Sequence, residues 1–134
     1  MQWEYGRRIL SVSSTQEDHD SLCHILNDPG WLITGVFSCQ QAVSYLCRER
    51  SAIIICACHV PDGTWRDILS HIAELTDPPL VIVTAEAAEE SLRAEVHALG
   101  GYDVLAKPFV AEEVSHMLSA AWKQRASVLE PVPA

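Results

Sequence analysis

The most reactive pair of side chains in the sequence is Cys56 and Cys58, two thiols separated by one residue at the end of an apolar run. In a strand, both thiols would point to the same face. A thiol pair can bind zinc or form a redox disulfide, but a zinc site needs further ligands, and His59 is the only adjacent candidate. Buried thiols that fill core space are therefore the favoured interpretation, with metal or redox use as the alternative.

The histidines add no catalytic pattern. No two of them have the spacing of a ligand pair on one helix face, so surface or helix-capping positions are expected for His19, His24, His59, His71, His97 and His116. No order of Ser, His and Asp, or of Cys and His, suggests a hydrolase. We therefore do not expect an enzyme, a metal or a cofactor.

The stretch that positions these cysteines runs from Ala52 to Gly63. Its apolar part, to Cys58, is followed directly by the turn residues Pro61, Asp62 and Gly63 and then by a helical pattern. A buried parallel strand ends in this way, and in open α/β sheets the ligand or the chemistry sits at the carboxyl ends of the strands.

Strands and helices alternate five times along the rest of the chain. Periodicity and turn residues predict strands at 8–12, 31–37, 52–58, 80–83 and 102–106. Helices are predicted at about 17–27, after Ser38, after Gly63, at about 87–99, and from Val110 to about Arg125. Their expected inner faces include Ala42, Val43, Leu46 and Cys47; Trp65, Ile68, Leu69, Ile72 and Leu75; Ala88, Leu92, Val96 and Leu99; and Val110, Val114, Met117, Leu118 and Ala121.

This alternation predicts one α/β domain with a doubly wound, five-stranded parallel sheet and five helices. The domain is expected to span residues 8–125. Residues 126–134, which include Pro131 and Pro133, are expected to form a flexible C-terminal tail that could lead to an output domain in a longer protein.

Composition limits the kinds of partner. The 134 residues carry a formal net charge of -9, which argues against direct nucleic-acid binding because such binding rests on Lys and Arg. No apolar run is long enough to cross a membrane, and the first residues lack a signal-peptide pattern, so a cytoplasmic location is expected. Five cysteines without a disulfide-scaffold spacing are expected to be free thiols.

Four short motifs, in order, resemble the receiver domain of two-component response regulators. They are the R-I-L-S-V strand before a polar turn, the V-P-D-G loop, Thr84-Ala85, and Lys107-Pro108-Phe109 at the end of A-L-G-G-Y-D-V-L-A-K-P. The resemblance covers roughly residues 8–122 and implies a flavodoxin-like sheet of strand order 2-1-3-4-5.

The resemblance also shows which functional residues are missing. Family members accept a phosphoryl group on their own aspartate, which stands four residues before the loop proline. The residue at that position is Ala57 here. They hold Mg²⁺ with an acidic pair after the first strand, and the matching residues are Ser13 and Ser14. The aromatic residue of the family's switch corresponds to Val104, whose side chain cannot swing between buried and exposed rotamers.

Two parts of the family's site are retained. Thr84 matches the hydroxyl residue that contacts the phosphoryl group, and Lys107 matches the lysine that stabilises it. Two interpretations of Lys107 stay open: an ion pair with Glu86, Asp62 or Asp103, or a pocket in which Lys107, Thr84, Ser13 and Ser14 bind an anion. Trp65 could pack in the core, cover the pocket or anchor a partner.

These departures lead us to expect a degenerate receiver, or pseudo-receiver. It would mediate protein–protein interaction in a signalling pathway without aspartyl phosphorylation, and its partner would be a kinase, an output domain or a second copy, with no nucleic acid and no membrane. The exposed residues expected on the partner face are Glu89, Glu90, Arg93, His97, Glu112, Glu113 and His116. The alternatives are a small-molecule or anion sensor, a redox module of Cys56 and Cys58, or an ordinary phosphorelay receiver if the register is wrong.

Overall fold

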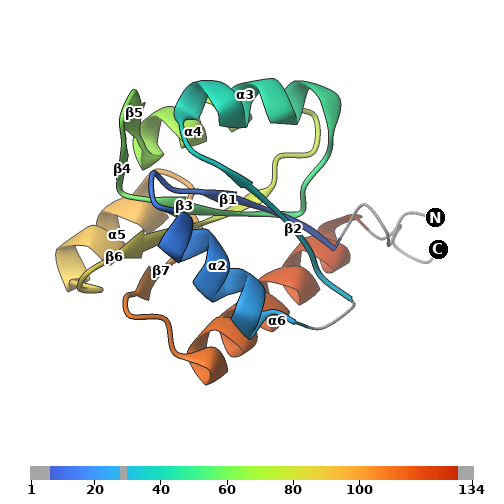
Figure 1. The fold of residues 1–134 in the computed structure, drawn as a ribbon. Helices are drawn as coiled ribbons and strands as arrows, with labels where there is room; N and C mark the ends of the chain where they lie inside the picture. Colours follow the sequence, from blue (N-terminus) through green and yellow to red (C-terminus); the bar gives the residue numbers. More distant parts are fainter. Residues whose placement is uncertain (1–6, 28–29, 130–134) are drawn as a thin grey trace.

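A central parallel sheet organises the computed structural model, which describes residues 7–27 and 30–129. Its strands are β1 (Arg8–Val12), β2 (Leu32–Val36), β3 (Ile53–Ala57), β6 (Leu80–Ala85) and β7 (Asp103–Ala106). All four pairings are parallel, in the order β2-β1-β3-β6-β7. This order is the predicted 2-1-3-4-5 arrangement, so the fold prediction is confirmed (Figure 1).

Strand β3 lies in the middle of the sheet and is buried along its whole length. Its three consecutive isoleucines suit a strand covered on both faces, because branched side chains pack well on a pleated surface. In such a strand the side-chain period of two sends Ile54 and Cys56 to one face and Ile53 and Ile55 to the other.

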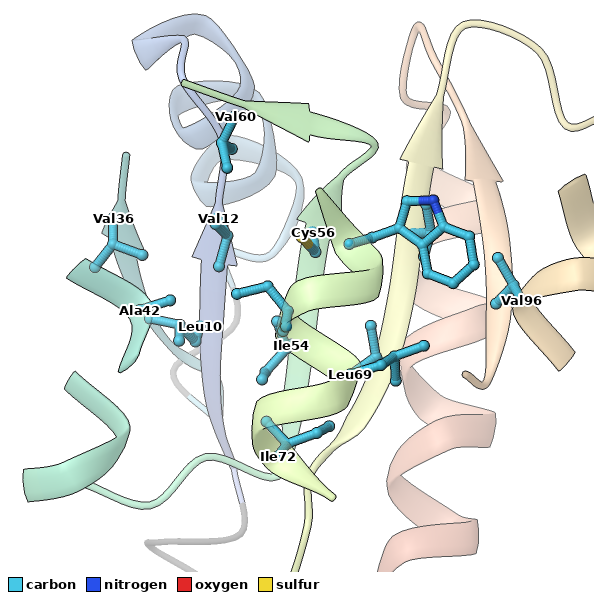
Figure 2. Packing of buried hydrophobic residues seen from close by; sticks show 14 of the residues in the cluster. Leu10, Val12, Val36, Ala42, Ile54, Cys56, Val60, Leu69, Ile72 and Val96 are labelled. Carbon is cyan, nitrogen blue, oxygen red and sulfur yellow. The ribbon is translucent and has the colours of Figure 1, made fainter. Parts of the chain in front are cut away.

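Helices cover both faces of the sheet. On one face, α3 (Cys39–Arg48), α4 (Trp65–Ile72) and α5 (Glu90–Ala98) pack over a core that includes Ile54, Leu69 and Val96 (Figure 2). On the other face lie α2 (Gln16–Ile25) and α6 (Ala111–Leu129), with Leu22, Val114 and Leu118 fully buried. None of the helices in the described ranges is long and apolar enough to cross a membrane.

Three predicted core positions are wrong. Cys47 is exposed, and the inner side of α3 instead carries Tyr45 and Leu46, packed against the core. Leu99 is 52% exposed because α5 ends at Ala98 and the chain turns away through Gly100, which has a positive φ of 96°. Val110 is 49% exposed because it precedes the first residue of α6 and so does not share that helix's inner face.

Three helix limits also differ from the prediction. Helix α4 ends at Ile72, so Leu75, predicted on the inner face of this helix, lies in the turn that follows it, although it still packs against the core. Helix α5 begins at Glu90, three residues later than predicted, and α6 continues to Leu129, about one turn beyond the predicted end at Arg125. The predicted flexible tail falls in part on residues 130–134, which lie outside the described residues.

The loop after β3 contains a small hairpin that was not predicted. Strands β4 (His59–Val60) and β5 (Gly63–Thr64) pair antiparallel, and Asp62 at their turn accepts hydrogen bonds from the backbone N–H groups of Cys39 (2.7 Å) and Gln40 (2.9 Å). The hairpin is thereby tied to the first turn of α3. A Cβ at Gly63 would lie only 2.6 Å from Oδ2 of Asp67, so a larger residue here would displace the carboxylate that completes the N-terminal cap of α4.

Candidate functional site

The carboxyl ends of β3, β6 and β7 bring three of the predicted site residues together. Ala57 is the last residue of β3 and pairs in register with Thr84 on β6. Both are buried, with exposures of 8% and 3%. Lys107 directly follows β7, and its backbone N–H donates to the carbonyl of Ala85 at the end of β6 (2.8 Å). A methyl group, a hydroxyl and an ammonium therefore stand at one edge of the sheet.

The ammonium of Lys107 is paired with a carboxylate from a different element. Its Nζ lies 3.0 Å from Oδ2 of Asp18, in the first turn of α2. The predicted partners Glu86, Asp62 and Asp103 are wrong: Asp62 caps α3, and Asp103 lies beside Arg93 and His97. Asp18 is the partner of Lys107 because α2 starts directly after the short loop that follows β1.

Ser13 holds the same carboxylate from the β1 side. Its Oγ donates to Oδ2 of Asp18 (2.7 Å) and accepts a hydrogen bond from the backbone N–H of Thr15 (3.2 Å). The side chain of Thr15 in turn caps α2 by accepting from the backbone N–H of Asp18 (3.4 Å). Ser14, the other residue predicted at the metal position, is exposed.

These contacts change the acidity of Asp18. Burial by itself raises the pKa of the carboxyl group, but the hydrogen bonds from Ser13 and Lys107 and the charge of Lys107 outweigh it, so the pKa of Asp18 lies below its usual value. Asp18 is therefore ionised at neutral pH and gives Lys107 a permanent counter-charge.

His19 fixes the loop that carries Ser13. The ring is buried, its Nε2 donates to the carbonyl of Ser13 (3.1 Å), and its Nδ1 accepts from Oγ of Ser11 (2.8 Å). The prediction of a surface or capping histidine is wrong here, because a backbone carbonyl and a serine satisfy both ring nitrogens. A Cβ at Gly35 would lie 2.9 Å from Nδ1 of His19, so β2 needs glycine beside this ring.

The two cysteines at the end of β3 have no described ligand set around them. Cys56 is buried, and burial strongly raises the pKa of its thiol; burial also raises the pKa of the half-buried Cys58, despite the nearby charges of Lys107 and Arg66. Among the described residues no three His, Cys, Asp or Glu side chains are grouped to hold a metal ion. The core-packing interpretation suits these thiols best.

Trp65 belongs to the core. Its side chain is 2% exposed, and the guanidinium of Arg66 lies 4.7 Å from the centre of its ring. Nε of Arg66 also donates to Oε2 of Glu95 on α5 (2.7 Å). Packing is therefore the interpretation that the structure supports for Trp65.

Comparison with known proteins places this arrangement in context. No protein-family profile matches the sequence. The chain is 33% identical over 92 residues to the regulatory protein TcrX of Mycobacterium tuberculosis, covering 68% of this chain and 39% of TcrX. It is 25% identical over 124 residues to ARR20 of Arabidopsis thaliana, assigned as a two-component response regulator, covering 91% of this chain and 28% of that protein. It thus spans less than half of each of these relatives.

A solved structure decides the fold. The crystal structure of a signal receiver domain from Vibrio parahaemolyticus superimposes with a TM-score of 0.85 at 21% identity, covering 94% of this chain and 98% of that one. The chain has the fold of a response-regulator receiver domain. In receiver terms, Ala57 occupies the end of the central strand, and Thr84 and Lys107 lie at the ends of the next two strands.

The Mg²⁺ ion that the receiver family implies does not fit the residues at this edge. The carboxylate at the site, that of Asp18, already accepts from Ser13 and pairs with Lys107. The residues predicted at the family's acidic positions are Ser13, Ser14 and Ala57, which provide two neutral hydroxyls and a methyl group. Mg²⁺ is bound through carboxylates and dehydrates reluctantly, so this donor set is unsuitable.

The predicted partner face lies on α5, β7 and α6. Glu89, Glu90, His97, Glu112, Glu113 and His116 are exposed, and Arg93 is half-buried. Arg93 Nη1 lies 3.5 Å and His97 Nε2 3.7 Å from Oδ1 of Asp103. Val104, the residue predicted at the position of the family's aromatic switch, is 1% exposed and belongs to the core cluster that includes Ile54 and Val96.

Proposed function

We propose that this chain is a non-enzymatic signalling module of the receiver type, which binds a protein partner without being phosphorylated on an aspartate. The observation that supports the proposal is the pairing of Ala57 with Thr84 at the end of β3, beside a lysine that already has an internal counter-charge. A methyl group has no nucleophilic oxygen, so an acyl phosphate has no acceptor at this position.

Asp18 has a specific role in this proposal. In receivers, a phosphoryl group engages the hydroxyl and lysine positions and shifts a two-state equilibrium of the partner face. Here the Asp18 carboxylate provides the anion for Lys107 permanently, so the equilibrium stays in one state. The signal would then depend on whether the partner is present rather than on phosphate.

The face of α5, β7 and α6 is the proposed partner surface. Its partner is a kinase, an output domain or another protein of the same pathway. Anion sensing is the weaker alternative, because an anion at Lys107 would have to displace Asp18 from a short ion pair that Ser13 also supports.

Beryllofluoride with Mg²⁺ tests the proposal, because this mimic assembles only on an acceptor aspartate with a bound metal. We expect the amide NMR spectrum of the chain to be unchanged at concentrations that fully convert an ordinary receiver measured in parallel. Shifts at Ala57, Thr84 and Lys107 that need both beryllofluoride and Mg²⁺ would overturn it. Shifts with fluoride or sulfate alone would instead support the anion-sensor alternative.

A further inference from the structure

A groove runs between α5, β7 and α6 on the proposed partner face. Its volume is about 410 Å³, within the ~300–1,000 Å³ typical of sites that bind ligand groups. Val104 and Ala106 of β7 contribute to its lining, together with Ala88 before α5 and Met117 and Ala120 of α6. The groove lies at the edge of the sheet, because β7 is its last strand and α5 and α6 cover opposite faces.

The groove stays open because small side chains line it. Val104 is directed into the core, and the alanines at 88, 106 and 120 cannot reach across the space. Tyr102 contributes to the lining but is itself half-buried against the core under α6. Among the described residues, no aromatic side chain on β7 takes the central position that Val104 occupies. An aromatic side chain from outside could fill such a space, because aromatic anchors dominate protein interfaces when they enter a pocket.

The charges around the groove are mainly negative. Arg93 in its lining faces Asp103, so its charge is largely compensated. Glu113 on the opposite wall makes no ion pair with any described residue. His116 also lines the groove, whereas the exposed Glu89, Glu90 and Glu112 near the starts of α5 and α6 are not part of the lining. The uncompensated charge of Glu113, together with the net charge of -9 of the chain, favours a partner with basic residues beside its apolar anchor.

The geometry points to one occupant: a basic segment of a partner protein that inserts a single aromatic side chain into the groove above Val104. This inference rests on the proposed function, since it names the partner chemistry of the same face. A second copy of this chain is a poor occupant, because each copy carries a net charge of -9 and would bring no excess of basic residues to Glu113.

An unbiased selection tests the inference. The intact chain is used as bait for a displayed library of random twelve-residue peptides. We expect enriched sequences to share one Trp, Tyr or Phe flanked by at least two Lys or Arg residues. Enrichment of acidic sequences, of sequences without an aromatic residue, or of none above background would overturn the inference.

Two matched variants locate the binding. Ala120→Phe fills the groove from a half-buried helix position and should weaken binding of the selected peptide at least tenfold. Ser115→Phe adds the same ring at an exposed position of α6 that does not line the groove and should leave binding within twofold. Glu113→Lys should weaken binding at least fivefold at low salt. Equal binding by all variants would place the site elsewhere and overturn the inference.

The beryllofluoride measurement on the same samples distinguishes failure of the groove inference from failure of the proposed function. A spectrum unaffected by beryllofluoride, together with a failed selection, overturns the groove inference and leaves the proposed function standing. A spectrum that responds to beryllofluoride overturns the proposed function, and the groove assignment then holds only if the selected peptide binds equally with and without the mimic.

Discussion

Nζ of Lys107 and Oδ2 of Asp18 lie 3.0 Å apart, and the two residues come from opposite ends of the chain. The side chains are only 23% and 14% exposed, so water screens this pair less than an ordinary surface ion pair. Ser13 donates to the same oxygen at 2.7 Å. The contact joins the first turn of α2 to the residue that follows β7 and gives the Lys107 ammonium an internal counter-charge.

Removal of the Asp18 charge should destabilise the fold. Asp18→Asn weakens the hydrogen bonds from Ser13 and Lys107, and we expect the free energy of unfolding to fall by about 1–3 kcal/mol, the range for hydrogen bonds to charged groups. Urea denaturation at pH 7 measures it. Glu17→Gln, which removes an exposed charge from the same turn of α2, should cost less than about 0.5 kcal/mol. Equal effects of the two variants would contradict the role given to Asp18.

The same pair predicts a pH dependence. The folded-state pKa of Asp18 lies below the ordinary value of 3.8, so its contribution is complete above that pH and is lost as the pH falls through the lower, folded-state pKa. The stability difference between the native chain and Asp18→Asn should therefore be constant from pH 7 to about 5 and shrink below pH 3.8. A difference that grows on acidification would have the wrong sign.

Restoring the acceptor alone should not restore phosphorylation. Ala57→Asp supplies a carboxylate, but the metal position still consists of Ser13 and Ser14, and Lys107 remains paired with Asp18. We expect no phosphorylation of the single variant and measurable phosphorylation only when Ser13→Asp is added, followed as hydroxylamine-labile ³²P incorporation. Efficient labelling of Ala57→Asp alone would show that this edge of the sheet still binds Mg²⁺ adequately.

Thiol reactivity should follow burial. Cys23 and Cys47 are exposed and should react in the first, fast phase of labelling with a thiol reagent at pH 8. Burial, followed by the charges of Asp62 and Asp67, raises the pKa of Cys39 to about 11, so this thiol should react slowly. Cys56 should react only when the chain unfolds. Mild oxidation that joins Cys56 to Cys58 in the folded protein would instead favour the redox alternative.

Much of the fold could be predicted because single residues carry clear local signals. The three consecutive branched isoleucines of β3 favour a strand whatever surrounds them. Two of the three wrong core positions lie just outside an element. Leu99 and Val110 continue a helical pattern in the sequence, but each lies one residue outside its helix, and periodicity does not define helix ends.

The candidate site was predicted only in part. Ser13, Ala57, Thr84 and Lys107 come from strand ends, which the alternation of elements brings together. Asp18 was missed because the pairing of a first-turn helix residue with a lysine 89 positions later depends on how α2 sits over the sheet. One signal was available: Thr15 followed three residues later by an acidic residue is a helix-start pattern, and it places Asp18 in the turn nearest the strand ends.

The central claim is that no acyl phosphate forms at the carboxyl end of β3. Incubation of the chain with acetyl phosphate and Mg²⁺, followed by intact-mass spectrometry, tests it most directly when an ordinary receiver domain is treated in parallel. We predict an unchanged mass for this chain while the parallel domain gains one phosphoryl group. A hydroxylamine-labile gain of one phosphoryl group, mapped to a carboxylate beside Lys107, would contradict the claim.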